Sequence, residues 1–332
     1  MELLLEMEHL FTTLNNFIYK TRAKLLLARF LSVNNLPASL VSSIEIKKHK
    51  AIDESLSSFF HVSISASLIG SEEKILFSGL DPKFYVATEK AISEFAEGLF
   101  LTSESKNQEI NRSGIAAHVA EKESKYKAYL ELVERDSFLM HYLCPQLKNS
   151  ILFKSENEAY VYTVNELQST DELISVCMGT IYNKKENNFY IGLSAGSKNH
   201  SDLSLIQGAL QEAVMLDANW TSPQFFTLNK NFKKMIMLQT HIDVLKNKNS
   251  LLCFHALLNG GGDQFLNYKT NKEKIIFETC IKFKKRVITR ARHDDLLPLQ
   301  FGDQWIQSRK TYEELLHARG LELTNWSYHP LL

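Results

Sequence analysis

The sequence has no excess of charge of either sign and no long uncharged apolar run. Lys plus Arg and Asp plus Glu number 38 each among 332 residues. No overall field therefore favours binding to nucleic acid or to an anionic membrane. No stretch approaches the ~20 uncharged apolar residues of a membrane-spanning helix. An apolar share of 44% and a charged share of 23% are typical of a soluble globular protein with a sizeable core.

Cysteines are few, and none of them forms a recognisable motif. The four are Cys144, Cys177, Cys253 and Cys280. They lie far apart, and no CxxC or Cys/His cluster has the spacing of a zinc site. We expect reduced, buried thiols. The first residues, MELLLEMEHLF, carry glutamates where a secretory signal peptide needs positive charge. These features favour a cytoplasmic protein.

Familiar catalytic and nucleotide-binding motifs are also missing. The sequence contains neither GxxxxGK[ST] nor GxGxxG, and no Ser/His/Asp or Cys/His nucleophile pattern is recognisable. A local basic run at 282–292 is interleaved with apolar residues such as Phe283 and Ile288. This mixture predicts a strand with one basic face rather than a nucleic-acid groove. Among Arg286, Arg290 and Arg292 we expect at least two solvated side chains and one that contacts a nucleotide.

Hydrophobic periodicity predicts alternating helices and groups of strands. Helices are expected at 1–32, 83–101, 203–216 and 312–319, with a helical pair or a helix and turn at 239–258. A strand-like or turn segment at 111–118 should lead into a long helix that ends near residue 143. Strands are expected within 42–80 and at 151–153, 159–164, 173–182, 189–193, 274–278 and 283–289, with loops at 102–111, 183–188 and 192–200. This order predicts an α+β (mixed α/β) fold, with an N-terminal helix/strand region at 1–105 and a core at 106–332.

The long helix carries the sequence ELVER, with Glu131, Glu134 and Arg135. Two carboxylates three residues apart lie on nearly the same helix face, and the arginine is turned about 100° away. Such a helix can hold a hard cation with its carboxylates and offer the guanidinium to phosphate oxygens. A solvated Glu–Arg face is the commoner arrangement for this spacing, so spacing alone leaves both interpretations open.

Two stretches share a layout in which a small-residue segment precedes a helix that carries glutamate. The first is SGIAAH before Glu131 and Glu134, and the second is SAGSKNH before Glu212. Loops rich in Gly and Ser expose backbone N–H groups that can cradle phosphates, and helix N-termini favour anions. Without a known nucleotide motif, this pair of stretches is weak evidence for a phosphate site.

The stretch SGIAAHVAEKESKYKAYLELVERDSFLMHY resembles the central signature of the YcaO family, a run like S-N-G-x-A-A-G, a helix, and then E-x-x-E-R-D. The residues that fit the run are Gly114, Ala116, Ala117, Glu131, Glu134, Arg135 and Asp136, while Ser113 holds the place of its Asn. Glu212 matches the first carboxylate of a later family block. LLPLQFG at 296–302 is similar to an L-x-P-L-x-F-G segment, and the final HPLL to an H-P-x-P tail. The likeness runs from about residue 110 to the C-terminus.

This resemblance implies an enzyme that binds ATP and Mg²⁺ and activates the oxygen of a peptide backbone amide. In cyclodehydratases of the family, a Cys, Ser or Thr side chain of a ribosomally made precursor peptide attacks that amide. Phosphorylation lets the oxygen leave as phosphate, and a thiazoline or oxazoline forms. Magnesium and arginine neutralise charge on the transferring phosphoryl group. The products of such pathways include bacteriocins.

The resemblance assigns roles to individual residues. It implies that Glu131, Glu134 and Glu212 are magnesium ligands and that Arg135 contacts phosphate or fixes a glutamate. The residues expected to contact the cofactor are Ser113, Gly114, Glu131, Glu134, Arg135, Asn199, Glu212 and Arg286, and those expected to be catalytic are Arg135 and Pro330. His118 stands where the family often has Gly, and a structural role is the commoner one for such a histidine.

Two departures from the family pattern leave a second hypothesis open. Met215 stands where the later block has Gln or Glu, and Leu332 replaces the second proline of the tail. A thioether is a poor partner for magnesium. These departures motivate the hypothesis that the chain is a degenerate, non-catalytic scaffold of a peptide-modifying complex. A thioamide-forming enzyme that uses sulfide is a third alternative within the same chemistry, and the sequence does not decide it. The resemblance also implies a separate E1-like or winged-helix protein that captures the leader peptide, and it leaves open an FMN-dependent dehydrogenase and a homodimer.

Overall fold

A computed structural model describes residues 2–52, 54–67, 74–104, 113–198, 202–220, 262–284, 286–298, 307–324 and 326. The chain forms two compact units. Unit 1 comprises residues 1–108, 117–120 and 280–288, and unit 2 comprises 109–116, 121–279 and 289–332. Among the described residues, no helix is long and apolar enough to cross a membrane. The predicted helices at 239–258, and Cys253, lie outside the described residues.

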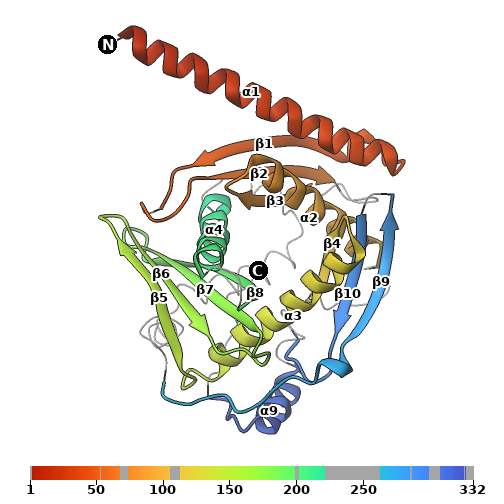
Figure 1. The fold of residues 1–332 in the computed structure, drawn as a ribbon, viewed down its shortest axis with the longest axis vertical. Helices are drawn as coiled ribbons and strands as arrows, with labels where there is room; N and C mark the ends of the chain where they lie inside the picture. The colour runs from red at the N-terminus through yellow and green to blue at the C-terminus, as the bar shows by residue number, and fades with distance from the viewer. Residues whose placement is uncertain are drawn as a thin grey trace. The chain divides into compact units, whose positions relative to one another are not determined.

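Unit 1 contains a three-stranded antiparallel sheet in the order β1–β2–β3, with two helices (Figure 1). Its complete elements are α1 (Glu2–Val33), the short 3₁₀ helix η1 (Ala38–Leu40), β1 (Val41–His49), β2 (Phe59–Ser67), β3 (Lys74–Asp81) and α2 (Phe84–Glu104). The central strand β2 is buried along most of its length. Helix α2 packs on β2 and β3, and Phe30 of α1 meets Phe95 of α2 edge to face.

Unit 2 contains a four-stranded antiparallel meander in the order β5–β6–β7–β8. Its complete elements are α3 (Glu121–Leu143), β5 (Asn149–Glu156), β6 (Tyr160–Leu167), β7 (Ile174–Asn183), β8 (Asn188–Ser197), α4 (Asp202–Trp220), the 3₁₀ helix η2 (Lys272–Lys274) and α9 (Arg309–Ala318). A third sheet, each strand of which has residues assigned to both units, has the order β4–β10–β9, and its strands are β4 (Ile115–His118), β10 (Arg286–Arg292) and β9 (Ile276–Phe283). The predicted mixed α and β fold is confirmed.

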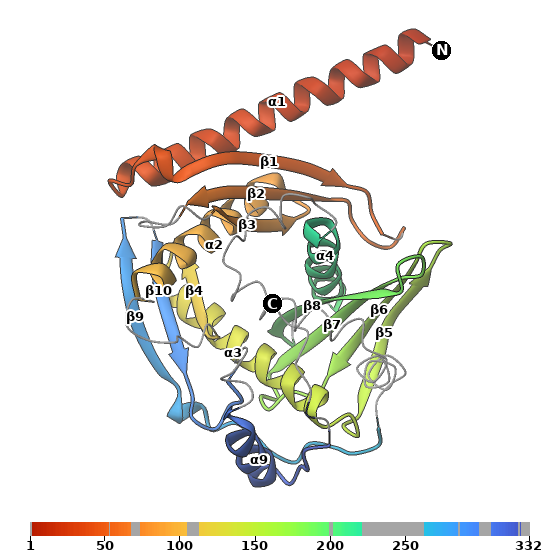
Figure 2. The ribbon, with the colours of Figure 1, turned by 180° about the vertical axis from the view of Figure 1, so that it is seen from behind.

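The two long helices of unit 2 cover opposite faces of the meander (Figures 1 and 2). Side chains of a strand alternate between the two faces of its sheet. On β8, Ile191 and Leu193 join the main core cluster with α3 residues such as Phe138 and Tyr142, whereas Tyr190 packs with Ala213 of α4. Strand β8 therefore has α3 on one face and α4 on the other.

The predicted loop at 192–200 is wrong for residues 192–197, which belong to β8. This segment pairs with β7 from Gly192 opposite Gly179 to Ser197 opposite Ile174. A Cβ at either glycine would come within 2.8 Å of the α4 backbone, including the carbonyl oxygen of Ala209. Small residues are needed here because a helix lies directly on the strands, not because the chain forms a flexible loop.

Candidate active site

Helix α3 carries the two glutamates of ELVER into the interior of unit 2. Its first turn is acidic, with Glu121 and Glu123, which suits the positive end of a helix dipole. The Ser124 hydroxyl donates to the carbonyl oxygen of Ala116 (2.7 Å) and fixes the helix against β4. The side chains of Glu134 and Arg135 are only 14% and 16% exposed. The commoner interpretation of the spacing, a solvated Glu–Arg face, is therefore wrong.

Glu131 lies against the strand that precedes its helix. The backbone N–H of Ile115, the first residue of β4, donates to Glu131 Oε2 (3.2 Å). Gly114 directly before it has a φ of +74°, and its carbonyl oxygen accepts the N–H of Ala291 (2.7 Å). A Cβ at Gly114 would lie 2.5 Å from the carbonyl oxygen of Ala291. Only glycine fits this backbone angle and this approach, so Gly114 sets the start of β4.

Glu212 lies on α4, where the helix comes closest to the sheet. Ala209 and Ala213, on either side of it in the sequence, are fully buried against the glycines of β7 and β8. The Leu193 N–H donates to Glu212 Oε2 at 2.5 Å. Burial raises the pKa of Glu212, whereas Arg135 and this hydrogen bond oppose the rise.

Glu134 meets the same strand two residues further on. Its carboxylate accepts the N–H of Ala195, and the guanidinium Nε of Arg135 lies 4.0 Å from its Oε1. Burial raises the pKa of Glu134 to about 8, and the neighbouring Glu212 and Glu131 carboxylates add to the rise, against the attraction of Arg135. A carboxyl group with such a pKa holds its proton at neutral pH unless a cation replaces it.

The three predicted carboxylates thus lie at the margins of two strands. Glu131 faces an amide of β4, and Glu134 and Glu212 face alternate amides of β8, the last strand in the order of the meander. Within the described part of the chain, no group of three or more His, Cys, Asp or Glu side chains stands ready to hold a metal ion. Each carboxylate has further lone pairs beyond the one that accepts its amide, and oxygen donors suit Mg²⁺.

Solved structures share this arrangement of elements, although no protein-family model and no curated protein matches the sequence. The YcaO protein of Methanopyrus kandleri, solved with AMPPCP and Mg²⁺ bound, matches with a TM-score of 0.53 and 11% identity. The match covers 82% of this chain and 90% of that one. The chain has the YcaO fold. At this identity the likeness concerns the fold and not the activity.

Two further structures match with a TM-score of 0.47. The microcin synthetase McbBCD complex of E. coli is 10% identical, and the match covers 76% of this chain and 88% of that one. A heterocyclase in complex with substrate and cofactor is 13% identical, and the match covers 80% of this chain and 52% of that one.

The last residue of the YcaO-like signature, Asp136, has a structural position. Its carboxylate accepts the N–H of Leu297 (2.8 Å), the hydroxyl of Thr170 (3.1 Å) and Nη1 of Arg319 (2.8 Å). Asp136 and Arg319 are both almost fully buried. Leu297 lies in the LLPLQFG segment, of which only residues 296–298 are described. Asp136 thereby anchors that segment and α9 to α3.

The structure describes most of the other predicted site residues. Ser113 is buried directly before Gly114, and Met215 is partly buried on α4. His118 accepts the Ala120 N–H through Nδ1 (3.3 Å), which is a local structural role. Asn199, with its neighbour His200, and Pro330 with the rest of the HPLL tail lie outside the described residues.

The prediction that at least two arginines of the late strand are solvated is wrong. Arg286 and Arg290 are both buried, and only Arg292 is exposed, beside Glu278. Arg286 belongs to unit 1, where its guanidinium donates to Glu89 and to Ser93 Oγ and lies over the Phe30 ring. Burial of a guanidinium is tolerated when carboxylate and hydroxyl partners satisfy its donors, as Glu89 and Ser93 do for Arg286.

One further glutamate, in unit 1, was not expected from the sequence. Glu97 of α2 accepts the N–H of Ala117 through Oε1 (2.6 Å), much as Glu131 accepts that of Ile115. Glu94 and Glu97 have the same three-residue spacing as Glu131 and Glu134. This repeated spacing is the feature of the sequence from which the position of Glu97 could have been predicted.

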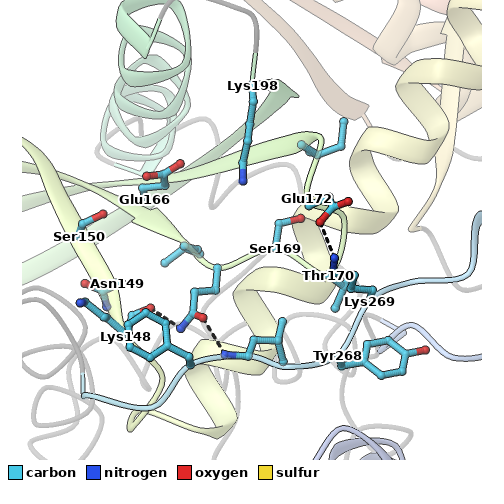
Figure 3. A pocket seen from close by; sticks show the side chains of 15 residues that line it. Lys148, Asn149, Ser150, Glu166, Ser169, Thr170, Glu172, Lys198, Tyr268 and Lys269 are labelled. Atoms are coloured by element: carbon cyan, nitrogen blue, oxygen red, sulfur yellow. Dashed lines mark hydrogen bonds and ion pairs between the residues drawn. The ribbon is translucent and has the colours of Figure 1, made fainter.

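Unit 2 also has an open pocket of about 350 Å³ that none of the predicted site residues lines (Figure 3). Three lysines contribute to it, namely Lys148, Lys198 and Lys269, and Lys269 pairs with Glu172 at 2.6 Å. Gln168, which also lines the pocket, donates to the carbonyl oxygens of Lys148 and Gln264. The pocket has no counterpart in the sequence prediction.

Proposed function

We propose that this chain uses ATP to activate backbone amides of a ribosomally made precursor peptide, by cyclodehydration of Cys, Ser or Thr to a thiazoline or oxazoline. The observation that supports the proposal best is the set of three glutamates, Glu131, Glu134 and Glu212, at the margins of β4 and β8 in a YcaO fold. The YcaO structure with this fold holds AMPPCP, an analogue of ATP, and Mg²⁺.

In this proposal the three glutamates hold magnesium and Arg135 contacts the phosphates. The raised pKa values of Glu134 and Glu212 fit a site that needs a cation, because buried carboxylates without one favour the neutral form. Metal binding displaces their protons, and its strength should therefore increase with pH. Ser113 and Gly114 are proposed to contact the nucleotide beside β4. Asn199 remains a proposed nucleotide contact, and Pro330 a proposed residue of the active-site tail. Arg286, predicted from the sequence as a nucleotide contact, is not kept in this proposal, because Glu89 and Ser93 hold its guanidinium within unit 1.

Bound with magnesium, ATP supplies the phosphoryl group that turns a poor leaving group, the amide oxygen, into phosphate. The substrate's thiol or hydroxyl loses its proton and adds to the amide carbon. This addition closes the five-membered ring. The bond from carbon to the phosphorylated oxygen then breaks, the oxygen leaves as phosphate, the nitrogen loses its proton, and a C=N bond forms within the ring. The task of this chain is to neutralise charge with its arginine and to hold the reacting groups in place.

The proposal includes partners. A separate E1-like or winged-helix protein should bind the leader of the precursor peptide, and an FMN-dependent dehydrogenase oxidises the azoline where an azole is the product. Because ATP is the co-substrate, we place the activity in the cytoplasm. Thioamide formation uses the same amide activation with sulfide as the nucleophile.

Calorimetry of ATP binding with and without Mg²⁺ tests the proposal. Glu212→Gln and Glu131→Gln should each abolish magnesium-dependent binding, because each removes a charged ligand, while circular dichroism stays that of the folded protein. Glu123→Gln is the matched control, since Glu123 is exposed in the first turn of the same helix. Binding that survives in both test variants would refute the site assignment.

A second candidate function is a non-catalytic scaffold within a peptide-modifying complex. Two features of the sequence favour it, namely Met215, about one turn after Glu212, and Leu332 in place of the second proline of the tail. The same calorimetry separates the two candidates. A wild-type chain that binds no ATP with Mg²⁺, alone and with its leader-binding partner, supports the scaffold.

A further inference from the structure

Helix α1 is apolar on two opposite faces, and unit 1 covers only one of them. The covered face includes Ala23, Leu27 and Phe30, all of which are buried. On the other face Leu14 is 53% exposed and Leu25 is 65% exposed. A helix that is apolar on both sides needs a partner on the second, because an exposed apolar stripe favours association.

The exposed stripe follows a heptad pattern. Its positions are Leu14, Ile18, Thr21, Leu25 and Ala28, which alternate between steps of four and three residues. The sequence continues the same register toward the N-terminus of α1 with Leu at 4, Met at 7 and Phe at 11. Four heptads with this spacing are typical of a coiled-coil seam. The pattern of the exposed face thus favours packing against another helix.

The charges of α1 are segregated along its length. Its N-terminal part is acidic, with Glu2, Glu6 and Glu8, and its C-terminal part is basic, with Lys20, Arg22, Lys24 and Arg29. Two parallel copies would bring like charges together, whereas two antiparallel copies bring each acidic part beside a basic part. This complementarity selects a second copy of the same helix, in antiparallel orientation.

We propose that α1 forms an antiparallel coiled coil with α1 of a second copy of this chain. When the two antiparallel helices are aligned at their middle heptads, each small residue of the seam faces a large one, and the remaining large residues face each other. The facing pairs of positions in the sequence are Leu4 with Ala28, Met7 with Leu25, Phe11 with Thr21, and Leu14 with Ile18. A parallel arrangement would instead stack Thr21 on Thr21 and Ala28 on Ala28, which leaves gaps in the seam.

Helix α1 is accessible for this pairing within unit 1. It lies along β1 and continues past the end of that strand (Figure 1). Phe17, which is 68% exposed, flanks the centre of the seam. In the antiparallel dimer it lies beside Phe17 of the second copy and adds aromatic burial at the middle of the interface.

Sedimentation or light scattering of the full chain at micromolar concentration measures the assembly. The wild-type chain should have the mass of a dimer, and Ile18→Glu should shift it to a monomer, because the substitution buries a charge in the seam. Asn16→Glu is the matched control, since it adds the same charge at an exposed position off the seam and should stay dimeric. A monomeric wild type, or a dimer that Ile18→Glu leaves unchanged, overturns the proposal.

Charge reversal tests the orientation. In the antiparallel dimer Glu8 of one copy flanks Arg22 of the other, so Glu8→Lys and Arg22→Glu should each raise the dimer Kd by ~2–5-fold. The double variant should restore the wild-type Kd, because the attraction is re-formed with reversed signs. A double variant whose Kd is raised by the combined effect of the two single substitutions contradicts the antiparallel pairing. The proposal is also contradicted if α1 of the wild type binds only a different protein.

Discussion

Glu134 and Asp136 lie two residues apart on α3, and their carboxylates meet very different surroundings. Asp136 accepts three hydrogen bonds, from Thr170, Leu297 and the guanidinium of Arg319. Glu134 has one backbone amide, a guanidinium Nε at 4.0 Å and two carboxylates nearby. The Asp136 carboxylate is satisfied by the protein itself, whereas burial and the neighbouring carboxylates disfavour the charged form of Glu134.

This difference separates a residue that stabilises the fold from one that we propose to bind a ligand. Removing one partner of a buried ion pair strongly lowers the stability of the folded protein, because the remaining charge is left buried without compensation. A carboxyl group with a raised pKa destabilises the folded protein in its charged form, and such groups cluster at sites where they act on a ligand. Substitutions at the two positions should therefore change the free energy of unfolding in opposite directions.

The largest effect should come from Asp136→Ala. It leaves the buried charge of Arg319 without its carboxylate and should lower the free energy of unfolding by about 3–5 kcal/mol. Urea unfolding followed by circular dichroism measures the change. Asp294→Ala is the control, because Asp294 is exposed in the same turn as Asp295 and should shift the midpoint little. A loss below about 1 kcal/mol for Asp136→Ala would contradict the assigned role of Asp136.

The opposite result is expected for Glu134→Gln in the absence of Mg²⁺. The pKa of Glu134 is about 8 in the folded protein and lies near 4.5 in the unfolded chain. The folded state therefore binds more protons between these values, and the stability of the wild type should fall as the pH rises through this window. Glutamine stays neutral, so the variant should show a shallower decline and be about 0.5–2 kcal/mol more stable at pH 8.

Unfolding curves at a series of pH values between 5 and 8.5 measure this slope, with Glu123→Gln as the exposed control on the same helix. Glu212 has a raised pKa as well, so part of the decline should remain in Glu134→Gln. A variant that keeps the full wild-type slope would show that Glu134 does not titrate in this window.

The smallest effect should come from Thr170→Val. The substitution keeps the shape and removes one of the three donors of Asp136, so it should cost ~1 kcal/mol in the free energy of unfolding. Comparison with Asp136→Ala in a double-mutant cycle measures how much of the larger loss runs through this hydroxyl. Additive losses would place Thr170 outside the network of Asp136.

Much of the local structure could be predicted from the sequence. Periodicity located α1, α2, α3 and the strands of the meander, and the E-x-x-E-R-D pattern with its small-residue segment indicated the YcaO fold. The errors share a cause. The stretch at 192–197 looks like a loop because it is rich in Gly, Ser and Ala, but α4 needs small residues in the strands on which it lies.

The prediction that at least two arginines of the late strand are solvated was wrong for a related reason. When arginines alternate with apolar residues along a strand and no partner can be identified from the sequence, the arginine side chains are expected to be solvated. Arg286 is buried because Glu89 and Ser93, almost two hundred residues earlier, satisfy its guanidinium. Pairing over such distances in the chain has no local signal, because side-chain partners are set by packing and not by spacing.

The sequence by itself determined the mixed α and β fold and its likeness to the YcaO family, and it placed Glu131, Glu134 and Asp136 on one long helix. Only the tertiary structure decided that Glu134 is buried without a full partner while Asp136 is satisfied. The reason is physical: the state of a buried charge depends on the groups that surround it in space. For Glu134 these come from α4 and β8, and for Asp136 from Thr170, Leu297 and Arg319, a residue 183 positions away along the chain.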